Sequence, residues 1–398
     1  MTFKNTPAIH VYFIRGTEKL YLGRLVLKNR KVFFEYDPEF IKTGLEVSPL
    51  KLPLKTGVIV CEDRIFDGLF GVFNDSLPDG WGRLLFDRKL MTLSLNSNDL
   101  SPLDRLCHVG SSGMGALVYE PEIDATATRA RRDLDEIADE IKQFQENNND
   151  KFVDDLLAMN GSSAGACPKI LTKIDGEDWI IKFCSSLDPT DIGPIEYAYH
   201  LMAKAANLYI PEAKIFQSKK GPGYFGVKRF DRVNNKRVHM HTISGLLHAD
   251  YRFPSLDYKT VMKATIWLTK DIGEAEKQFR SSVFNVLSHN RDDHAKNFSF
   301  LMDEKGVWRV SLAYDLTFSS GPNGEHCTMI MGEGKSPNVS HLLKLAEISG
   351  IKKQKSMQII DEIKSAVSKV SKWDEFAKIS GVTSMSLKMI KTELKGVI

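Results

Sequence analysis

The segment from 289 to 297, His-Asn-Arg-Asp-Asp-His-Ala-Lys-Asn, holds side chains whose types and spacing suit phosphoryl transfer. Asp292 precedes Asn297 by five residues. In phosphoryl-transfer enzymes an Asp at this separation orients the accepting hydroxyl, and the Asn holds magnesium. Asp293 precedes Asn297 by only four residues and is the weaker candidate for the base. Polar loop residues that cap a helix ending near Ser288 would have the same composition, so the spacing needs support from its surroundings.

The residues after Asn297 predict a hairpin that supplies this support. Residues 298–302 have the pattern of a short apolar strand, 303–306 that of a turn ending in glycine, and 307–312 that of a returning strand. A hairpin brings its two ends together, so Asn297 should lie close to Asp315. Amide and carboxylate oxygens are the hard ligands that magnesium takes beside nucleotide phosphates. The hairpin therefore predicts a pair of metal ligands at its open end.

A run of small residues upstream, 160–169 (NGSSAGACPK), has the composition of an anion-binding loop, because small side chains let backbone amides approach closely. It is neither a Walker loop nor Gly-x-Gly-x-x-Gly, and a plain surface turn also explains it. The run leads into a predicted hairpin of strands 169–174 and 179–183. Lys182 is a charged residue inside the second, apolar strand. Its ammonium either reaches an anion such as a nucleotide phosphate or extends to water.

Two further elements follow this hairpin. Residues 194–208 predict a helix with Pro at its first turn and apolar residues at helical spacing. Residues 224–230 predict a strand that leads from a small lobe into a helical one. In a kinase, the backbone at this place holds adenine.

Four motifs of the chain closely resemble the HipA family, bacterial serine/threonine kinases of toxin–antitoxin modules. They are residues 162–169 (SSAGACPK), 290–299 (NRDDHAKNFS), 313–317 (AYDLT) and 70–83 (FGVFNDSLPDGWGR). The resemblance covers nearly the whole chain, and the first three motifs are specific in combination and in order. The fourth looks like the signature of the family's amino-terminal domain, but its residues suggest no chemistry by themselves.

The resemblance implies a role for individual positions. Asp292 would be the catalytic base, and Asn297 and Asp315 would bind Mg²⁺. The positions implied to contact ATP are Ala164, Gly165, Ala166, Cys167, Pro168 and Lys169 in the phosphate loop, the nucleotide lysine Lys182, the hinge residues Lys228, Arg229 and Phe230, and His294, Asn297, Tyr314 and Asp315. Two departures from eukaryotic kinases limit the analogy. Asp315 is followed by Leu-Thr rather than Phe-Gly, and Asn290 replaces the usual His before Arg-Asp, which removes one support of the loop.

Within the family, self-phosphorylation of the phosphate-loop serine shuts the enzyme off. The matching motif points to Ser162, with Ser163 beside it as the alternative. A phosphoserine carries about −1.5 to −2 charge, so beside ATP phosphates it would repel them. A Ser162 that only bonds backbone atoms in a turn is the competing interpretation.

Composition indicates a cytoplasmic protein of two or three domains. The 398 residues are 42% hydrophobic and carry a net charge of +3, and neither a membrane-spanning segment nor a signal-peptide core is apparent. Five cysteines without metal spacing predict reduced thiols. Residues 335–398 contain twelve lysines and six acids, which indicates a solvated face or, alternatively, docking to an acidic protein or nucleic acid. No basic patch interleaved with aromatic residues is present, so direct nucleic-acid binding is not predicted.

The predicted fold is α+β, bilobal and protein-kinase-like. Residues 1–105 form a β-rich domain with alternating strand segments at 8–14, 20–27 and 32–36. Residues 106–230 form a small α/β nucleotide-binding lobe. Residues 231–398 form a mainly helical lobe, in which 261–268 and 274–287 are the clearest helical segments. The predicted function is transfer of phosphate from Mg-ATP to a protein serine or threonine. The resemblance implies an aminoacyl-tRNA synthetase as a possible target, growth arrest as an outcome and a HipB-like DNA-binding antitoxin as a partner. The alternative is a catalytically silent, nucleotide-binding corepressor that acts with its antitoxin.

Overall fold

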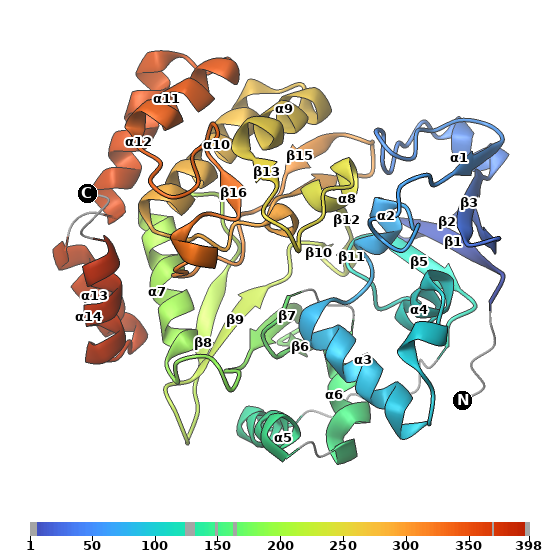
Figure 1. Cartoon of the computed structure of the whole chain (residues 1–398), viewed down its shortest axis with the longest axis horizontal. Helices are drawn as coiled ribbons and strands as arrows, with labels where there is room; N and C mark the ends of the chain where they lie inside the picture. Colours follow the sequence, from blue (N-terminus) through green and yellow to red (C-terminus); the bar gives the residue numbers. More distant parts are fainter. Residues whose placement is uncertain (1–5, 124–131, 148–149, 162–164, 368–369, 395–398) are drawn as a thin grey trace. The chain divides into compact units, whose positions relative to one another are not determined.

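The structure, a computed structural model, describes residues 6–123, 132–147, 150–161, 165–367 and 370–394. The chain forms two compact units, and most of their elements are labelled in Figure 1. The first comprises the chain up to residue 188 together with 228–248 and 301–307, and the second comprises 189–227, 249–300 and 308–398. Both combine helices with strands, in agreement with the predicted α+β class. The division into three domains stays a prediction.

The first unit contains a five-stranded antiparallel sheet with the strand order β4-β3-β2-β1-β5. Its strands are β1 (Ala8–Arg15), β2 (Glu18–Lys28), β3 (Lys31–Tyr36), β4 (Val58–Val60) and β5 (Leu117–Glu120). In β1 every second residue, Ile9, Val11 and Phe13, is buried, which is the period of a strand with one face on the core. The three strands predicted between residues 8 and 36 are confirmed. The sheet also includes β5, which lies beyond the boundary at residue 105.

The first unit also contains helices, some of which begin at a side-chain cap or a proline. They are α1 (Pro38–Lys42), α2 (Gly71–Asn74), α3 (Gly80–Thr92), α4 (Pro102–Val109), α5 (Leu134–Asn147), α6 (Val153–Asn160) and α8 (Ile243–Leu247). At α4, the Ser101 hydroxyl accepts from the Asp104 N–H and the Asp104 carboxylate accepts from the Ser101 N–H, a capping box that satisfies the first turn. Short strands of this unit are β10 (Arg232–Val233), β11 (Lys236–Arg237) and β12 (His239–Thr242).

The predicted hairpin after the small-residue loop is present. It consists of β6 (Lys169–Ile174) and β7 (Glu177–Lys182), paired so that Lys169 stands opposite Lys182. The turn is Asp175-Gly176, and both residues have positive φ (53° and 81°). Asp-Gly suits such a two-residue turn because these residues tolerate left-handed backbone. The hairpin therefore places two lysines side by side at the end of the loop.

Helices dominate the second unit, as predicted for the carboxy-terminal part. They are α7 (Ile192–Ala205), α9 (Tyr258–Thr269), α10 (Ile272–Leu287), α11 (Val339–Ile348), α12 (Lys353–Val367), α13 (Val370–Ser380) and α14 (Ser384–Leu394). Helix α10 contacts α9 and α12, and α7 contacts α13. In the second pair, the rings of Tyr199 and Trp373 meet edge to face with centroids 5.5 Å apart. Asp257 and Asp271 cap α9 and α10.

The strands of the second unit are short. They are β8 (Ala213–Phe216), β9 (Tyr224–Lys228), β13 (Leu256–Asp257), β14 (Ser299–Met302), β15 (Trp308–Val310) and β16 (Thr328–Met329), with the last residue of β9 and the last two of β14 in the first unit. The predicted hairpin turn is confirmed by the Gly306 N–H, which donates to the Asp303 carbonyl over 3.0 Å. At its open end, the Ser311 N–H donates to the Ser299 carbonyl over 2.9 Å. No helix in the described part of the chain is long and apolar enough to cross a membrane.

Candidate active site

The candidate catalytic loop follows α10 in the second unit. The amide nitrogen of Asn297 donates to the backbone carbonyl of Asp292 over 2.7 Å, so the loop folds back on itself and brings the two residues together. Asp292 is exposed, and Asn297 is half-buried in a short 3-10 turn. The spacing in the sequence therefore corresponds to a local cluster in the structure.

The residues after the hairpin join this cluster. The Tyr314 hydroxyl donates to the carbonyl of Lys296, the residue before Asn297. Asp315 has a left-handed backbone (φ 58°), which Asp tolerates better than most residues. Its charge acts on Asp292. His294 is half-buried, with its ring 5.9 Å from that of Tyr251.

The environment raises the pKa of Asp292 above its usual value. Desolvation by the surrounding protein is the main cause, and the negative charges of Asp315 and Asp293 add to it, while His294 opposes the change. Because the side chain itself is exposed, solvent screens part of this effect. A carboxylate with a raised pKa is a stronger proton acceptor than an ordinary surface Asp, as a general base requires.

The donor set of the cluster fits magnesium. The side-chain nitrogen of Asn297 donates to the Asp292 carbonyl, so the side-chain oxygen is the atom that would bind a cation. Asp315 would supply a carboxylate oxygen. No group of three or more His, Cys, Asp or Glu within the described ranges could hold a metal by itself. Magnesium commonly takes only one or two protein ligands and completes its shell with phosphate oxygens and water. Two oxygen ligands therefore suit a metal that arrives with a nucleotide.

Asp293 has a different environment from its neighbour. It is fully buried, and its carboxylate accepts from the Tyr258 hydroxyl and from His326 Nδ1, each over 2.8 Å. The Thr328 N–H also donates to it over 3.2 Å. This burial explains why Asp293 is the weaker candidate for the base. No sequence spacing connects Tyr258 or His326 with the loop, so both escape prediction.

Asn290, which stands where eukaryotic kinases have His, is also part of the support. It is buried, and its amide nitrogen donates to the Asn285 side-chain oxygen over 3.0 Å. The Ser319 N–H donates to the His289 carbonyl over 3.0 Å. These two hydrogen bonds support the catalytic loop at the position where eukaryotic kinases have His.

Cys327 lies beside the candidate base. Its thiol donates to an Asp292 carboxylate oxygen with an S–O distance of 3.8 Å. Burial raises the pKa of this thiol to about 12, and the charges of Asp292 and Asp293 contribute. Cys327 is therefore a protonated neighbour of Asp292 at neutral pH. None of the five cysteines forms a disulfide, as the sequence predicts.

The candidate phosphate loop lies in the first unit. Ser162, Ser163 and Ala164 are outside the described residues. Gly165 has φ 103°, and a Cβ at this position would collide with the ammonium of Lys169. Lys169 is buried, and Lys182, its partner across the hairpin, is half-buried. The first residue of β6 and the last residue of β7 are therefore both lysines, next to the candidate phosphate loop.

Three residues connect Gly165 with the hairpin. Ala166 is exposed, Cys167 is half-buried and Pro168 is buried. The Phe183 N–H donates to the Pro168 carbonyl over 2.8 Å. This bond fixes the end of the loop to the end of β7.

The candidate hinge, 228–230, also lies in the first unit. Lys228 forms an ion pair with Glu177 over 2.9 Å, and the Arg229 N–H donates to the Asp178 carbonyl over 2.8 Å. Phe230 is half-buried. The Arg229 N–H is thus engaged within the chain, so adenine would need other backbone groups of this segment.

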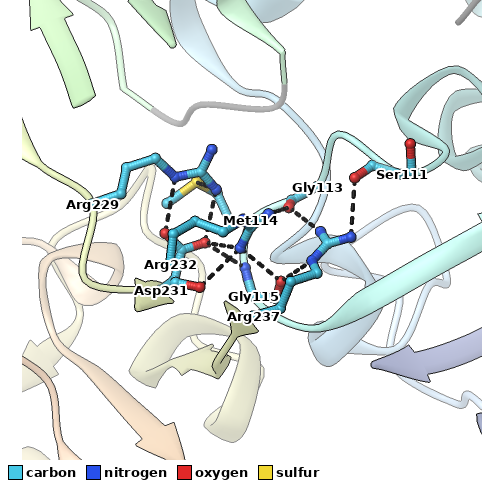
Figure 2. A network of polar contacts seen from close by, with 8 residues as sticks. All are labelled: Ser111, Gly113, Met114, Gly115, Arg229, Asp231, Arg232 and Arg237. Atoms are coloured by element: carbon cyan, nitrogen blue, oxygen red, sulfur yellow. Dashed lines mark hydrogen bonds and ion pairs between the residues drawn. The ribbon is translucent and has the colours of Figure 1, made fainter. Parts of the chain in front are cut away.

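Asp231, directly after the hinge, is the centre of a buried ionic network drawn in Figure 2. Its carboxylate accepts from Arg229 over 2.8 and 2.9 Å, from Arg232 over 2.7 Å and from the Gly115 N–H over 2.8 Å. Burial alone would raise the pKa of Asp231, but Arg229 and Arg232 hold it well below its usual range.

A third guanidinium extends this network. Arg237 donates to the backbone carbonyls of Ser111, Gly113 and Gly115 over 3.0, 2.6 and 2.9 Å (Figure 2). The residues after the hinge are therefore attached to the segment that precedes β5. Sequence reasoning missed this attachment, because nothing local marks Asp231 as buried.

Comparison with known proteins agrees with both regions of the chain. The HipA-like C-terminal domain matches residues 161–371, and the HipA N-terminal domain matches residues 17–120. The chain belongs to the HipA family. The resemblance drawn from the four motifs is thereby confirmed.

Two known proteins are similar to this chain. HipA of Shewanella oneidensis MR-1, solved with HipB and operator DNA, has 15% sequence identity and a TM-score of 0.72, over 98% of this chain and 95% of that one, and so shares the HipA fold. A putative kinase, Y4dM of Sinorhizobium fredii, is 23% identical over 154 residues. That match covers 35% of this chain and only 37% of Y4dM.

Proposed function

We propose that this HipA-family protein is a kinase that transfers the γ-phosphate of Mg-ATP to a serine or threonine hydroxyl of a protein. The observation that carries the proposal is the cluster of Asp292 and Asn297 in one loop with Asp315 from the segment after the hairpin, joined by the Asn297 bond and by the charge of Asp315 on Asp292. Membership of the HipA family and the partial match to a putative kinase support it.

Each residue of the cluster has a role in this mechanism. Asp292 accepts the proton of the attacking hydroxyl and orients its oxygen toward the γ-phosphate. The Asn297 amide oxygen and the Asp315 carboxylate hold Mg²⁺. When bound, the cation neutralises charge that develops on the phosphate oxygens. The protein thus acts mainly by positioning and electrostatic stabilisation, which dominate phosphoryl transfer.

The first unit contains candidate nucleotide-binding groups of its own. Lys169 and Lys182 offer two ammonium groups next to a loop of small residues, which suits a polyanion such as a triphosphate. Residues 228–230 would hold adenine through backbone groups other than the Arg229 N–H. Ser162, or Ser163, is the proposed self-phosphorylation site.

The biological setting is part of the proposal. The Shewanella HipA was solved together with HipB and operator DNA, which supports a HipB-like antitoxin as the partner of this chain. A cytoplasmic location, growth arrest and an aminoacyl-tRNA synthetase as target follow from the family expectation.

Phosphate transfer from radiolabelled ATP with Mg²⁺, followed by mass spectrometry of the labelled residues, tests the function. Asp292→Asn should abolish transfer while ATP binding remains, because the base is lost but the metal ligands stay. Asp315→Asn should lose both transfer and Mg²⁺-dependent ATP binding. Asp303→Asn is the matched control, since an Asn oxygen can still accept the two N–H bonds of this turn.

Two results would count against the kinase. Wild-type protein that binds Mg-ATP but labels neither itself nor any protein of a cell extract would favour the silent corepressor. Labelling of Asp or His instead of Ser or Thr would contradict the substrate class.

A further inference from the structure

The amino-terminal motif 70–83, to which no chemistry was assigned from the sequence, contacts the phosphate loop directly. The Asp79 carboxylate accepts the backbone N–H of Gly165. Two residues later, the Trp81 N–H donates to the Gly165 carbonyl over 3.0 Å. Both backbone hydrogen-bonding groups of Gly165 are thus engaged by one short segment of the motif.

The glycines of the motif make this approach possible. Gly80 has φ 42°, and a Cβ there would lie 2.6 Å from the Gly165 carbonyl oxygen and 2.7 Å from Ala166 Cα. A Cβ on Gly82 would collide with the amide nitrogen of Asn160, the residue that ends α6 just before the loop. Any larger residue at either position would push the motif away from the loop. The motif therefore lies against Asn160 and against Gly165 and Ala166.

The motif is itself held firmly. The Trp81 ring is buried and meets Phe144 of α5 edge to face, with centroids 5.5 Å apart. On the other side of Asp79, the hydroxyls of Ser76 and Tyr119 are 2.7 Å apart. Asp79 is 8% exposed, so its carboxylate has little water to compete for the Gly165 N–H. Asp79 lies between Ser76 and Trp81, which both contact other parts of the first unit, and these contacts limit its movement.

We propose that Asp79, Gly80 and Trp81 hold Gly165 and Ala166 of the phosphate loop in the conformation that receives the nucleotide phosphates, with Asp79 as the positioning residue. This inference rests on the proposed kinase function. A glycine loses more backbone entropy on ordering than any other residue, so fixing Gly165 only when the nucleotide binds would weaken binding. A contact already made before the nucleotide arrives removes that cost from binding. The amino-terminal domain thereby contributes to nucleotide affinity without touching the reacting atoms.

Nucleotide affinity of the full chain tests the proposal. Asp79→Ala should weaken Mg-ATP binding, measured by calorimetry, about tenfold, the size of one charged hydrogen bond, and should raise KM for ATP with little change in kcat. Asp79→Asn should fall between this variant and the wild type, because its amide oxygen can still accept the N–H. Gly80→Ala should also weaken binding, since the added methyl displaces Gly165.

Asp104→Ala is the matched control. Asp104 is a buried carboxylate of the same unit that accepts backbone N–H groups of Thr6 and Ser101, remote in sequence from the phosphate loop. This variant should lower the melting temperature and leave ATP affinity unchanged. A merely structural role of Asp79 would give the same result as Asp104.

Hydrogen exchange gives a readout that needs no catalysis. In protein without nucleotide, a peptide covering 160–169 should exchange faster in Asp79→Ala than in the wild type. Unchanged exchange would show that the contact does not order the loop and would overturn the proposal. Tighter ATP binding in Asp79→Ala would also overturn it, because Asp79 would then compete with phosphate.

The two hypotheses fail in distinguishable ways. If the wild type binds and transfers phosphate but Asp79→Ala binds ATP equally well, only the positioning role is lost. If the wild type binds no Mg-ATP, the kinase proposal fails and takes this inference with it.

Discussion

Replacing Asp293 by Asn should damage the catalytic loop without altering any residue that would contact substrate. The carboxylate accepts from Tyr258, His326 and the Thr328 N–H. An Asn oxygen can replace one carboxylate oxygen, but its NH₂ group would face a donor and leave at least one buried partner unsatisfied. Hydrogen bonds to a charged group contribute about 1.5–3 kcal/mol each, so we expect a loss of about 2–4 kcal/mol in the free energy of unfolding.

The kinetic effect follows from the position of Asp293 next to the base. A displacement of about 1 Å in Asp292 would reduce kcat roughly 100-fold, because the reaction depends on near-attack geometry. Urea unfolding would measure the first effect, and phosphate transfer under conditions where the variant remains folded would measure the second.

Tyr258→Phe is the graded control for this variant. It removes one donor to Asp293 and the acceptor of the Asn285 amide, and should cost about 1.5–3 kcal/mol of unfolding free energy with a smaller loss of kcat. An Asp293→Asn protein with wild-type stability and kcat would refute the view that this network supports the loop.

Three further predictions concern charged and ionisable groups. Asp231→Ala should cost about 3–5 kcal/mol of stability, because it leaves buried guanidinium groups without their anion, as urea unfolding would show. The folded-state pKa of Asp231 is depressed, so its contribution to the free energy of unfolding is present above about pH 4 and is lost as the pH falls through the folded-state pKa. Below pH 4 the stability of the wild type should therefore fall more steeply with decreasing pH than that of the variant, and equal slopes would contradict this. The raised pKa of Asp292 predicts that kcat/KM falls on the acid side at a higher pH than an ordinary Asp would give, and an acid limb at or below the usual Asp value would argue against it as the base. Cys327, with a pKa of about 12, should react with iodoacetamide at pH 8 much more slowly than the exposed Cys184, and equal rates measured by mass spectrometry would count against its protonated state.

Much of the local structure follows from the sequence. Alternating apolar residues predict β1 to β3, an Asp-Gly turn between apolar runs predicts the β6–β7 hairpin, and the sequence also predicts the helices α9 and α10. These features depend on neighbours within a few residues, which is the range that periodicity and turn chemistry report. The spacing of Asp292 and Asn297 belongs to the same class, since one loop carries both.

The partners of the buried polar groups, by contrast, were decided only by tertiary structure. Asp293 finds His326 at a separation of 33 residues, Gly165 finds Asp79 at 86, and Asp231 finds the Gly115 N–H at 116. An Asp has the same sequence signature whether it faces water or a buried donor. Its role depends on desolvation, and desolvation arises only when distant segments close around it. The sequence of this protein therefore determined which residues could do chemistry, and the packing of distant segments determined which residues hold them in place.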